Sequence, residues 1–296
     1  MVTIPDLLIT ARPRQWIKNL VCLAPLVFSG RLFNPEAIRQ ALLGFLCFCL
    51  ASSAVYVFND VRDRTQDRSH PVKRRRPVAA GTLSPTAALI EAALLLAATL
   101  IICYWTVPRF RVVLGLFVLL NLLYSLGAKS IPILDVMAIA LGFVFRVQSG
   151  IEAIAAPQSA WIILCTFFMA LFIAVGKRRG EIINQASAAW ANPRVVLTAY
   201  SLQFLDIMLA ISATTALVCY SIYAVTVQTN ETFLLTILPV AFGIGRYLML
   251  VIVQKEGEGP DELLTRDIPL ALTAVVWLFL SVTVLYLQLH LFPPAR

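Results

Sequence analysis

The chain has 296 residues, of which 59% are hydrophobic and only 14% are charged, and its mean hydropathy is +0.83. Soluble domains carry about 25% charged residues, so this composition excludes an ordinary soluble protein and indicates a membrane protein. The net charge of +8 does not indicate a nucleic-acid partner, because most Lys and Arg residues lie in short segments between apolar runs. Membrane topology alone requires basic residues at such places.

Apolar runs follow one another along the whole chain, each near the ~20 residues that a spanning helix needs. No polar stretch is long enough for a second domain. We therefore expect one all-α domain over residues 1–296, a polytopic bundle of nine transmembrane helices. The first run is the weakest, because Pro25 and Gly30 interrupt it. The expected helices cover residues 17–33, 38–58, 86–106, 110–126, 134–151, 160–176, 195–227, 232–253 and 268–291.

The connecting segments set the expected orientation. Most of the 24 Lys and Arg residues fall on one side of the nine helices, the side of the N-terminus. The positive-inside rule makes that side cytoplasmic and places the C-terminus outside. Nearly all the acids lie on the same side, in residues 59–85, 127–134, 177–194 and 254–267. Function is therefore expected at the cytoplasmic face of the membrane.

The end of the second expected helix is rich in oxygen ligands. If this helix continues, Asn59, Asp63 and Asp67 share one face at i, i+4 and i+8, and Asp60 neighbours Asp63. Such a row suits Mg²⁺, which takes carboxylates and completes its shell with substrate phosphates. The alternative is a solvated helix end of mixed charge. We interpret the row as a metal site in which Asp60, Asp63 and Asp67 are also catalytic.

A basic segment follows directly and strengthens this interpretation. Lys73, Arg74 and Arg76 lie within a short stretch after the acids. Topology explains some of these bases, but it does not explain acids and bases in one loop. A metal ion beside cationic side chains is how proteins hold a diphosphate and stabilise its charge as it leaves.

The pattern Asn-Asp-x-x-Asp-x-x-x-Asp from Asn59, followed by Arg76-Pro77 and Gly81, resembles the first aspartate motif of the UbiA-type prenyltransferase superfamily. That resemblance implies a nine-helix membrane enzyme that binds an isoprenyl diphosphate through Mg²⁺. The second aspartate motif of the superfamily departs from the pattern here. Asp135 is present, but Ile139 stands where a second acid is usual.

Further segments resemble one branch of the superfamily, the polyprenyl-phosphate (decaprenyl-phosphate) phosphoribosyltransferases. They are residues 12–19, 124–129, 142–146, 176–181 and 260–267. The resemblance implies phosphoribosyl diphosphate and a polyprenyl phosphate lipid as substrates. With Lys73, Arg74 and Arg76, the expected substrate-binding residues are Lys18, Asn19, Tyr124, Lys129, Asp135, Arg146, Lys177, Arg178 and Glu181.

Two of these residues and one further acid have alternatives. Lys18 is equally well explained as an interfacial lysine. Arg146 lies within an apolar run, where a charge is costly and needs a partner or a ligand. Its depth is undefined if the helix breaks near Gly142. Asp206 also lies within an apolar run, where it either pairs with an interior base such as Arg146 or contacts the substrate, and the structural pair is preferred.

The sequence therefore predicts an Mg²⁺-dependent phosphoribosyl transfer to a polyprenyl phosphate that supplies cell-wall arabinan synthesis. The alternative enzyme is a UbiA-type prenyltransferase that joins an isoprenyl diphosphate to an aromatic or other acceptor. A transporter or membrane scaffold is disfavoured, because the acids cluster at one loop face rather than at mid-membrane. The sequence leaves open whether the chain forms a homo-oligomer.

Overall fold

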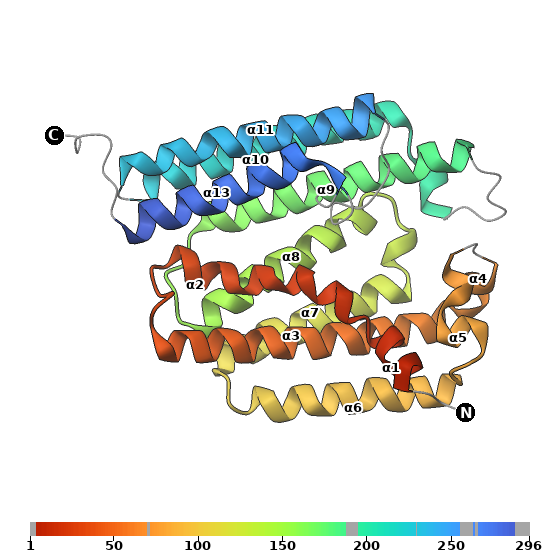
Figure 1. The fold of residues 1–296 in the computed structure, drawn as a ribbon. Helices are drawn as coiled ribbons and strands as arrows, with labels where there is room; N and C mark the ends of the chain where they lie inside the picture. Colours follow the sequence, from red (N-terminus) through yellow and green to blue (C-terminus); the bar gives the residue numbers. More distant parts are fainter. Residues whose placement is uncertain are drawn as a thin grey trace. The chain divides into compact units, whose positions relative to one another are not determined.

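The computed structural model describes residues 4–69, 72–187, 195–228, 230–254, 263 and 266–287. Within these ranges the chain is helical and contains no strand, which confirms the all-α expectation (Figure 1). The residues form two compact units. The first unit takes in residues up to Lys129 together with Phe145–Pro157, and the second takes in Ser130–Val144 and most of the chain after Gln158. The expectation of one domain over residues 1–296 stays a prediction.

Three long helices of the first unit begin in the same way. α3, α6 and α7 each start with a proline, which is compatible with the first helical turn because its missing N–H has no partner there. Asn34 and Ser84 cap α3 and α6 by accepting the N–H groups of Ala37 and Ala87. The elements of the first unit are α1 Ile4–Ala11, η1 Pro13–Leu23, α2 Ala24–Phe28, α3 Pro35–Arg62, α4 Arg64–Arg68, η2 Lys73–Arg75, α5 Pro77–Ala80, α6 Pro85–Cys103, α7 Pro108–Leu126 and the second part of α8.

The second unit consists of long helices with short 3₁₀ and π segments between them. α9 packs along α10, and α11 packs along α13. The short segment η3, Ala128–Ser130, lies at the boundary of the two units. The other elements are the first part of α8 Leu134–Ala153, α9 Ala160–Ser187, η4 Val195–Ala199, α10 Leu202–Thr226, η5 Glu231–Thr236, α11 Ile237–Leu248, the π-helix η6 Met249–Val253 and α13 Ile268–Tyr286.

Eight helical spans among the described residues are long and apolar enough to cross a membrane. They correspond to the second through ninth expected helices. The first expected helix, 17–33, is instead the 3₁₀-helix η1 followed by α2, with Pro25 in the first turn of α2. A 3₁₀-helix rises about 2.0 Å per residue, so η1 covers roughly 22 Å. α2 adds roughly 8 Å, and the pair approaches the ~30 Å thickness of the hydrocarbon core.

The 3₁₀-helix η1 packs closely against α8. A Cβ atom at Gly150 of α8 would lie 2.0 Å from the carbonyl oxygen of Cys22 in η1. Only glycine allows this approach of helix to backbone. The first unit also contains an aromatic core in which Phe48 packs against Phe110 and Phe117, with ring centroids 6.1 and 4.8 Å apart.

The second unit has its own core around α9. Phe172 packs against Tyr247 of α11 with ring centroids 4.9 Å apart. A Cβ atom at Gly176 would lie 2.6 Å from the Tyr247 hydroxyl, so the glycine makes room for that ring. α9 also runs past its expected end at residue 176 to Ser187. Lys177 and the basic residues after it are therefore helical rather than part of a loop.

Large apolar side chains lie on the outer surface of both units. Leu100 on α6 is 72% exposed and Phe279 on α13 is 68% exposed. A soluble domain rarely exposes long apolar helix faces of this kind. The pattern is that of helices whose outward faces contact lipid tails.

Candidate active site

The acidic row begins where α3 ends. Asp63 has left the helical conformation, yet its N–H bonds to the carbonyl of Asn59, and the N–H of Asp67 bonds to the carbonyl of Asp63, both at 2.8 Å. The i→i−4 pattern thus passes from α3 into α4 across a single non-helical residue. The side chains do not share one face as expected. Those of Asp60 and Asp67 meet at Arg76, whereas those of Asn59 and Asp63 contact Ser125 and Lys129.

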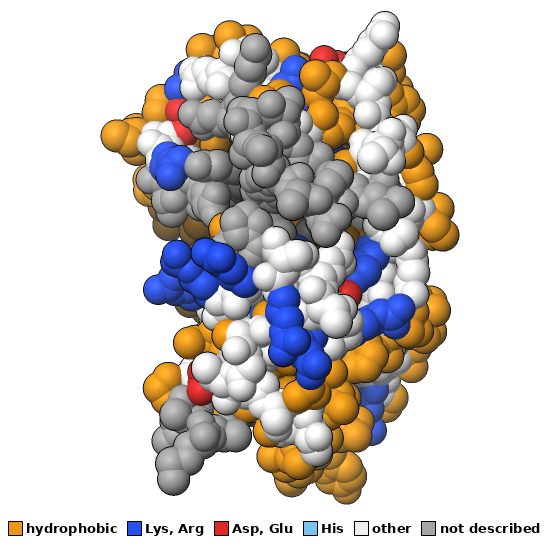
Figure 2. Space-filling view, turned by 90° about the vertical axis from the view of Figure 1, so that its right-hand side faces the viewer, with side chains coloured by type: hydrophobic (Ala, Val, Ile, Leu, Met, Phe, Trp, Pro, Cys, Tyr) orange, Lys and Arg blue, Asp and Glu red, His pale blue; other side chains and the backbone are white. Residues whose placement is uncertain are grey.

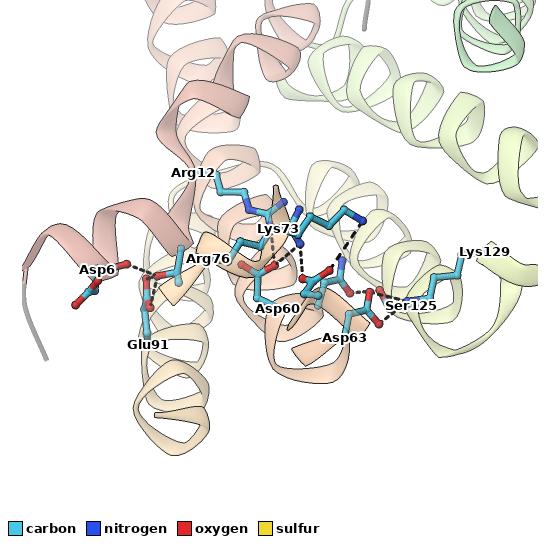
Figure 3. Close-up of polar contacts among 12 residues, drawn as sticks. Asp6, Arg12, Asp60, Asp63, Lys73, Arg76, Glu91, Ser125 and Lys129 are labelled. Atoms are coloured by element: carbon cyan, nitrogen blue, oxygen red, sulfur yellow. Dashed lines mark hydrogen bonds and ion pairs between the residues drawn. The ribbon is translucent and has the colours of Figure 1, made fainter. Parts of the chain in front are cut away.

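Two carboxylates of the row converge on one cation. Nη1 of Arg76 lies 3.1 Å from Oδ1 of Asp60 and 2.7 Å from Oδ2 of Asp67 (Figure 3). Both aspartates are buried, whereas the Arg76 side chain is 29% exposed. Arg12 also donates to Oδ1 of Asp60, and Nζ of Lys73 lies 3.9 Å from Asp67. The buried anions are therefore neutralised by cations that reach in from the surface.

The other two members of the row contact the end of α7 and η3. Nζ of Lys129 donates to both oxygens of Asp63 at 2.5 and 2.7 Å. The hydroxyl of Ser125 donates to Oδ1 of Asn59 and also to the carbonyl of Asn121 at 2.8 Å. Asp63 and Lys129 are both partly exposed. Lys129, expected to bind substrate, thus lies directly on the acidic row.

The charges of this cluster are unequal. Three carboxylates (Asp60, Asp63 and Asp67) face four cations (Arg12, Lys73, Arg76 and Lys129), so positive charge is in excess. Such a cluster would attract a polyanion such as a diphosphate. The end of the first unit that carries α4 and α5 faces the viewer in Figure 2, where Lys and Arg side chains gather at the surface. Arg74 is one of the exposed residues of η2.

The donor set fits a hard divalent cation only if the substrate completes the shell. Among the described residues, no three His, Cys, Asp or Glu side chains come close enough to hold a metal ion by themselves. However, Asp60 and Asp67 point their oxygens at one shared position, which Nη1 of Arg76 takes up. Mg²⁺ accepts one or two carboxylates and fills its remaining positions with phosphate oxygens and water.

A second set of expected residues lies deeper in the first unit. Nε of Arg146 donates to Oδ1 of Asn19 at 2.7 Å, and its guanidinium lies over the Phe117 ring, 4.7 Å from the centroid. α8 is unbroken through Gly142, so the break considered from the sequence is absent. Arg146 therefore has a polar partner and an aromatic face to offset the cost of its burial. Lys18 and Tyr124 are half-buried on η1 and α7.

The remaining expected residues belong to the second unit. Asp135 is fully buried, with Nε of Arg178 2.7 Å from Oδ2 and the Tyr200 hydroxyl 2.5 Å from Oδ1. Arg178 also donates to Glu181 at 2.9 Å. Burial raises the pKa of Tyr200 to about 12, and its hydrogen bond to Asp135 acts in the same direction. Asp135 and Arg178 thus neutralise each other, while Lys177 is exposed on α9.

Asp206 has a different partner from the expected one. Its Oδ1 accepts a hydrogen bond from Nε of Arg179 at 2.6 Å, whereas Arg146 belongs to the first unit and bonds to Asn19. Arg179 also donates to the carbonyl of Val251 in the π-helix η6. Asp206 does form an ion pair with a buried arginine, as expected. The partner differs because Arg179 lies on α9, which packs along the helix α10 that carries Asp206.

Sequence reasoning missed two residues of these clusters. Arg12 was seen only as part of a family-like segment, although it contacts Asp60. Tyr200 was placed inside a spanning helix, whereas it lies between η4 and α10 and bonds to Asp135. The position of Arg12, directly before a proline and outside the apolar run, could have indicated a functional role. Nothing in the local sequence around Tyr200 indicates its contact.

The family of this chain is established by a family model and by several relatives. The chain belongs to the UbiA prenyltransferase family, whose model matches residues 20–260. It is accordingly a multi-pass membrane protein of a transferase family.

Several relatives within the family share one name. Decaprenyl-phosphate phosphoribosyltransferase of Mycolicibacterium smegmatis is 33% identical over 290 residues, covering 93% of this chain and 91% of that protein. The protein of the same name from Corynebacterium glutamicum is 31% identical and covers 94% of this chain and 86% of its own length. The Mycobacterium tuberculosis protein is 33% identical over 273 residues, with 90% of both chains covered.

Solved structures agree on the fold. A UbiA homolog from Archaeoglobus fulgidus bound to DMAPP and Mg²⁺ matches 95% of this chain and 99% of that chain, with a TM-score of 0.74 and 18% identity. A digeranylgeranylglyceryl phosphate synthase structure matches 98% and 100%, with a TM-score of 0.69 and 14% identity. At such identities the likeness establishes the fold and not the substrate.

Proposed function

We propose that this chain transfers the 5-phosphoribosyl group of phosphoribosyl diphosphate to a polyprenyl phosphate in the synthesis of a cell-wall arabinan precursor. The observation that carries the proposal is the likeness, over 90% or more of the chain, to decaprenyl-phosphate phosphoribosyltransferases. The cation-rich acidic row supports it, because both substrates of such a reaction are polyanions.

In the proposed reaction a phosphate oxygen of the acceptor forms a bond to C1 of the ribose. The C1–O bond to the diphosphate breaks, and the diphosphate leaves with the bonding electron pair. The acceptor oxygen is already anionic, so no general base is needed. A bound Mg²⁺ would be held first through Asp60 and Asp67, with Asn59 and Asp63 as the other candidate ligands of the row, and would supply Lewis-acid neutralisation of the leaving group.

The side chains of the chain have separate roles in this proposal. Arg76 and Lys73 already lie beside the carboxylates, where preorganised cations stabilise charge that develops on the diphosphate. Lys129 orients Asp63. Lys177, which is exposed on α9, is the candidate that the sequence offers for the 5-phosphate, a group that an isoprenyl diphosphate lacks. The polyprenyl tail would lie along the apolar helix faces in lipid.

The proposed location is the cytoplasmic face of a bacterial inner membrane. It rests on the concentration of Lys and Arg on the side of α4, η2 and α5. A cysteine in place of Arg75 should then react with a membrane-impermeant thiol reagent only from the cytoplasmic side. Reaction from the outside would overturn the orientation.

A ligand comparison tests the donor. Phosphoribosyl diphosphate with Mg²⁺ should raise the thermal midpoint of the detergent-solubilised protein, as any ligand of the native state does. Geranylgeranyl diphosphate at equal concentration should raise it much less, and Lys177→Ala should reduce only the first effect. Transfer of label from phosphoribosyl diphosphate to a polyprenyl phosphate completes the test. The reverse preference would overturn the proposal and favour an isoprenyl donor.

A further inference from the structure

Arg12 has a backbone conformation that calls for an explanation. Its φ of 52° and ψ of 59° are left-handed, and the next residue is Pro13. A large side chain rarely adopts this conformation, and the position before a proline favours extended backbone. Residues are held in such conformations only where the surrounding contacts require it, often at functional positions.

The contacts that hold Arg12 come from one face of α3. The hydroxyl of Ser53 donates to the carbonyl of Ala11 at 2.6 Å, and Nε1 of Trp16 donates to the Ser53 hydroxyl at 3.0 Å. The Arg12 guanidinium lies over the Tyr56 ring, 5.2 Å from its centroid, and reaches Asp60. Ser53, Tyr56 and Asp60 are spaced i, i+3 and i+7, so a single face of α3 anchors the turn and receives its arginine.

A structural ion pair does not account for this arrangement. Oδ1 of Asp60 already accepts a hydrogen bond from Arg76 at 3.1 Å, and Arg12 donates to the same oxygen. Two guanidinium groups on one carboxylate oxygen repel each other. Asp60 is 2% exposed, while the Arg12 side chain keeps 23% exposure. The second cation is thus surplus to the needs of Asp60, and its side chain, like that of Arg76, is partly exposed.

We propose that Arg12 neutralises Asp60 while no metal ion is bound and moves to the diphosphate oxygens of the donor when the metal and donor arrive together. A divalent cation needs the Asp60 oxygens and therefore competes with Arg12. Once displaced, the planar guanidinium matches two phosphate oxygens at once. This inference rests on the proposed diphosphate donor. Arg12, which lies between α1 and η1, would then join Lys73 and Arg76 as a cation that contacts the diphosphate.

The experiment uses the full chain in detergent and measures thermal midpoints with two probes. The first probe is MgCl₂ alone, and the second is inorganic diphosphate at a fixed Mg²⁺ concentration. The variants are Arg12→Gln and Arg12→Gly. Glycine adopts a positive φ without steric cost, so Arg12→Gly should fold at least as well as wild type in EDTA. Arg14→Gln is the matched control, because Arg14 is an exposed arginine of the same segment.

The two probes should respond in opposite directions. In the Arg12 variants, the Mg²⁺ concentration that gives half of the maximal shift in thermal midpoint should fall roughly tenfold. The diphosphate concentration that gives half of its maximal shift should rise roughly tenfold. That is the scale of one charge-assisted hydrogen bond. Arg14→Gln should follow wild type with both probes. Weaker binding of both probes, or no change in either, would overturn the role of Arg12.

These outcomes are distinct from failure of the proposed function. Opposite shifts in the Arg12 variants, together with no transfer from phosphoribosyl diphosphate by the wild type, would retain Arg12 and reject the donor. Transfer by the wild type together with unchanged probe responses in both Arg12 variants would retain the donor and reject Arg12.

Discussion

The two units each contain a cluster of acids and arginines, and the clusters differ in how their charges are satisfied. In the first unit, Asp60 and Asp67 are buried but their cations are 23–29% exposed. In the second unit, Arg178 and Asp135 are 2% and 0% exposed, and both oxygens of Asp135 have partners. A cation that reaches in from the surface exchanges readily, whereas a sealed pair does not.

The difference indicates separate roles for the two clusters. Breaking a sealed pair leaves a buried charge, which costs far more than breaking a pair at the surface. The cluster around Asp135 therefore suits a scaffold. The cluster around Asp60 has more cations than anions and accessible partners, which suits the binding and release of a polyanion. The same residue types thus serve stability in one unit and exchange in the other.

The largest expected effect is on turnover, at Asp67. Asp67→Asn should lower phosphoribosyl transfer about a hundredfold or more, the scale of losing one preorganised charge at a reacting centre. Its thermal midpoint in EDTA should stay near that of wild type, because Arg76 keeps Asp60 as a partner. Asp6→Asn, at a hydrogen bond from Thr82, is the control and should remain active. Full activity of Asp67→Asn would remove the metal assignment.

The next effect is on stability, at Arg178. Arg178→Met should destabilise the protein by about 3–5 kcal/mol, because it leaves Asp135 charged and buried. Arg39→Met breaks the exposed pair with Glu36 and should leave the midpoint nearly unchanged. If Arg178→Met keeps a normal midpoint but no longer responds to phosphoribosyl diphosphate, Arg178 binds the donor and the contrast between the clusters fails.

The smallest effect concerns the Tyr200 hydroxyl. Tyr200→Phe should destabilise the protein by about 1–3 kcal/mol, because one oxygen of Asp135 loses its donor. Since the folded pKa of Tyr200 is raised to about 12, this contribution is complete below the unfolded pKa of about 10. It should then shrink as pH rises from 10 to 12. Midpoints of both proteins between pH 7 and pH 11 measure it, and a constant difference would contradict the hydrogen bond.

Periodicity and composition predicted most of the fold, because lipid forces long apolar runs to become helices. They also predicted the continuation of α3 toward Asp67, since i, i+4 spacing acts locally. Local spacing did not reveal that Asp60 and Asp67 share Arg76. That contact depends on the path of the chain between α4 and α5. Lys73 and Arg74 are equally basic, so composition could not select Arg76.

Contacts between distant segments were beyond the sequence for the same reason. The partner of Asp206 is Arg179 rather than Arg146. Both arginines carry the same charge, so only the packing of α9 along α10 determines which of them reaches Asp206. The extension of α9 to Ser187 was also missed. Charged residues marked the expected membrane boundary, yet α9 continues past them, and Arg178 and Arg179 are buried against neighbouring segments. The end of an apolar run in the sequence therefore does not mark the end of the helix.

The helix type of η1 has a consequence for the parity of the chain's membrane crossings. The eight long apolar spans by themselves would put the start of η1 and the end of α13 on the same face. The greater rise of the 3₁₀ turns lets Pro13–Phe28 act as a ninth crossing, and an odd number puts them on opposite faces. Reporter fusions placed before Arg12 and after Tyr286 should consequently report opposite compartments. The sidedness of one end of the protein is thus decided by eleven residues of unusually thin helix at the other.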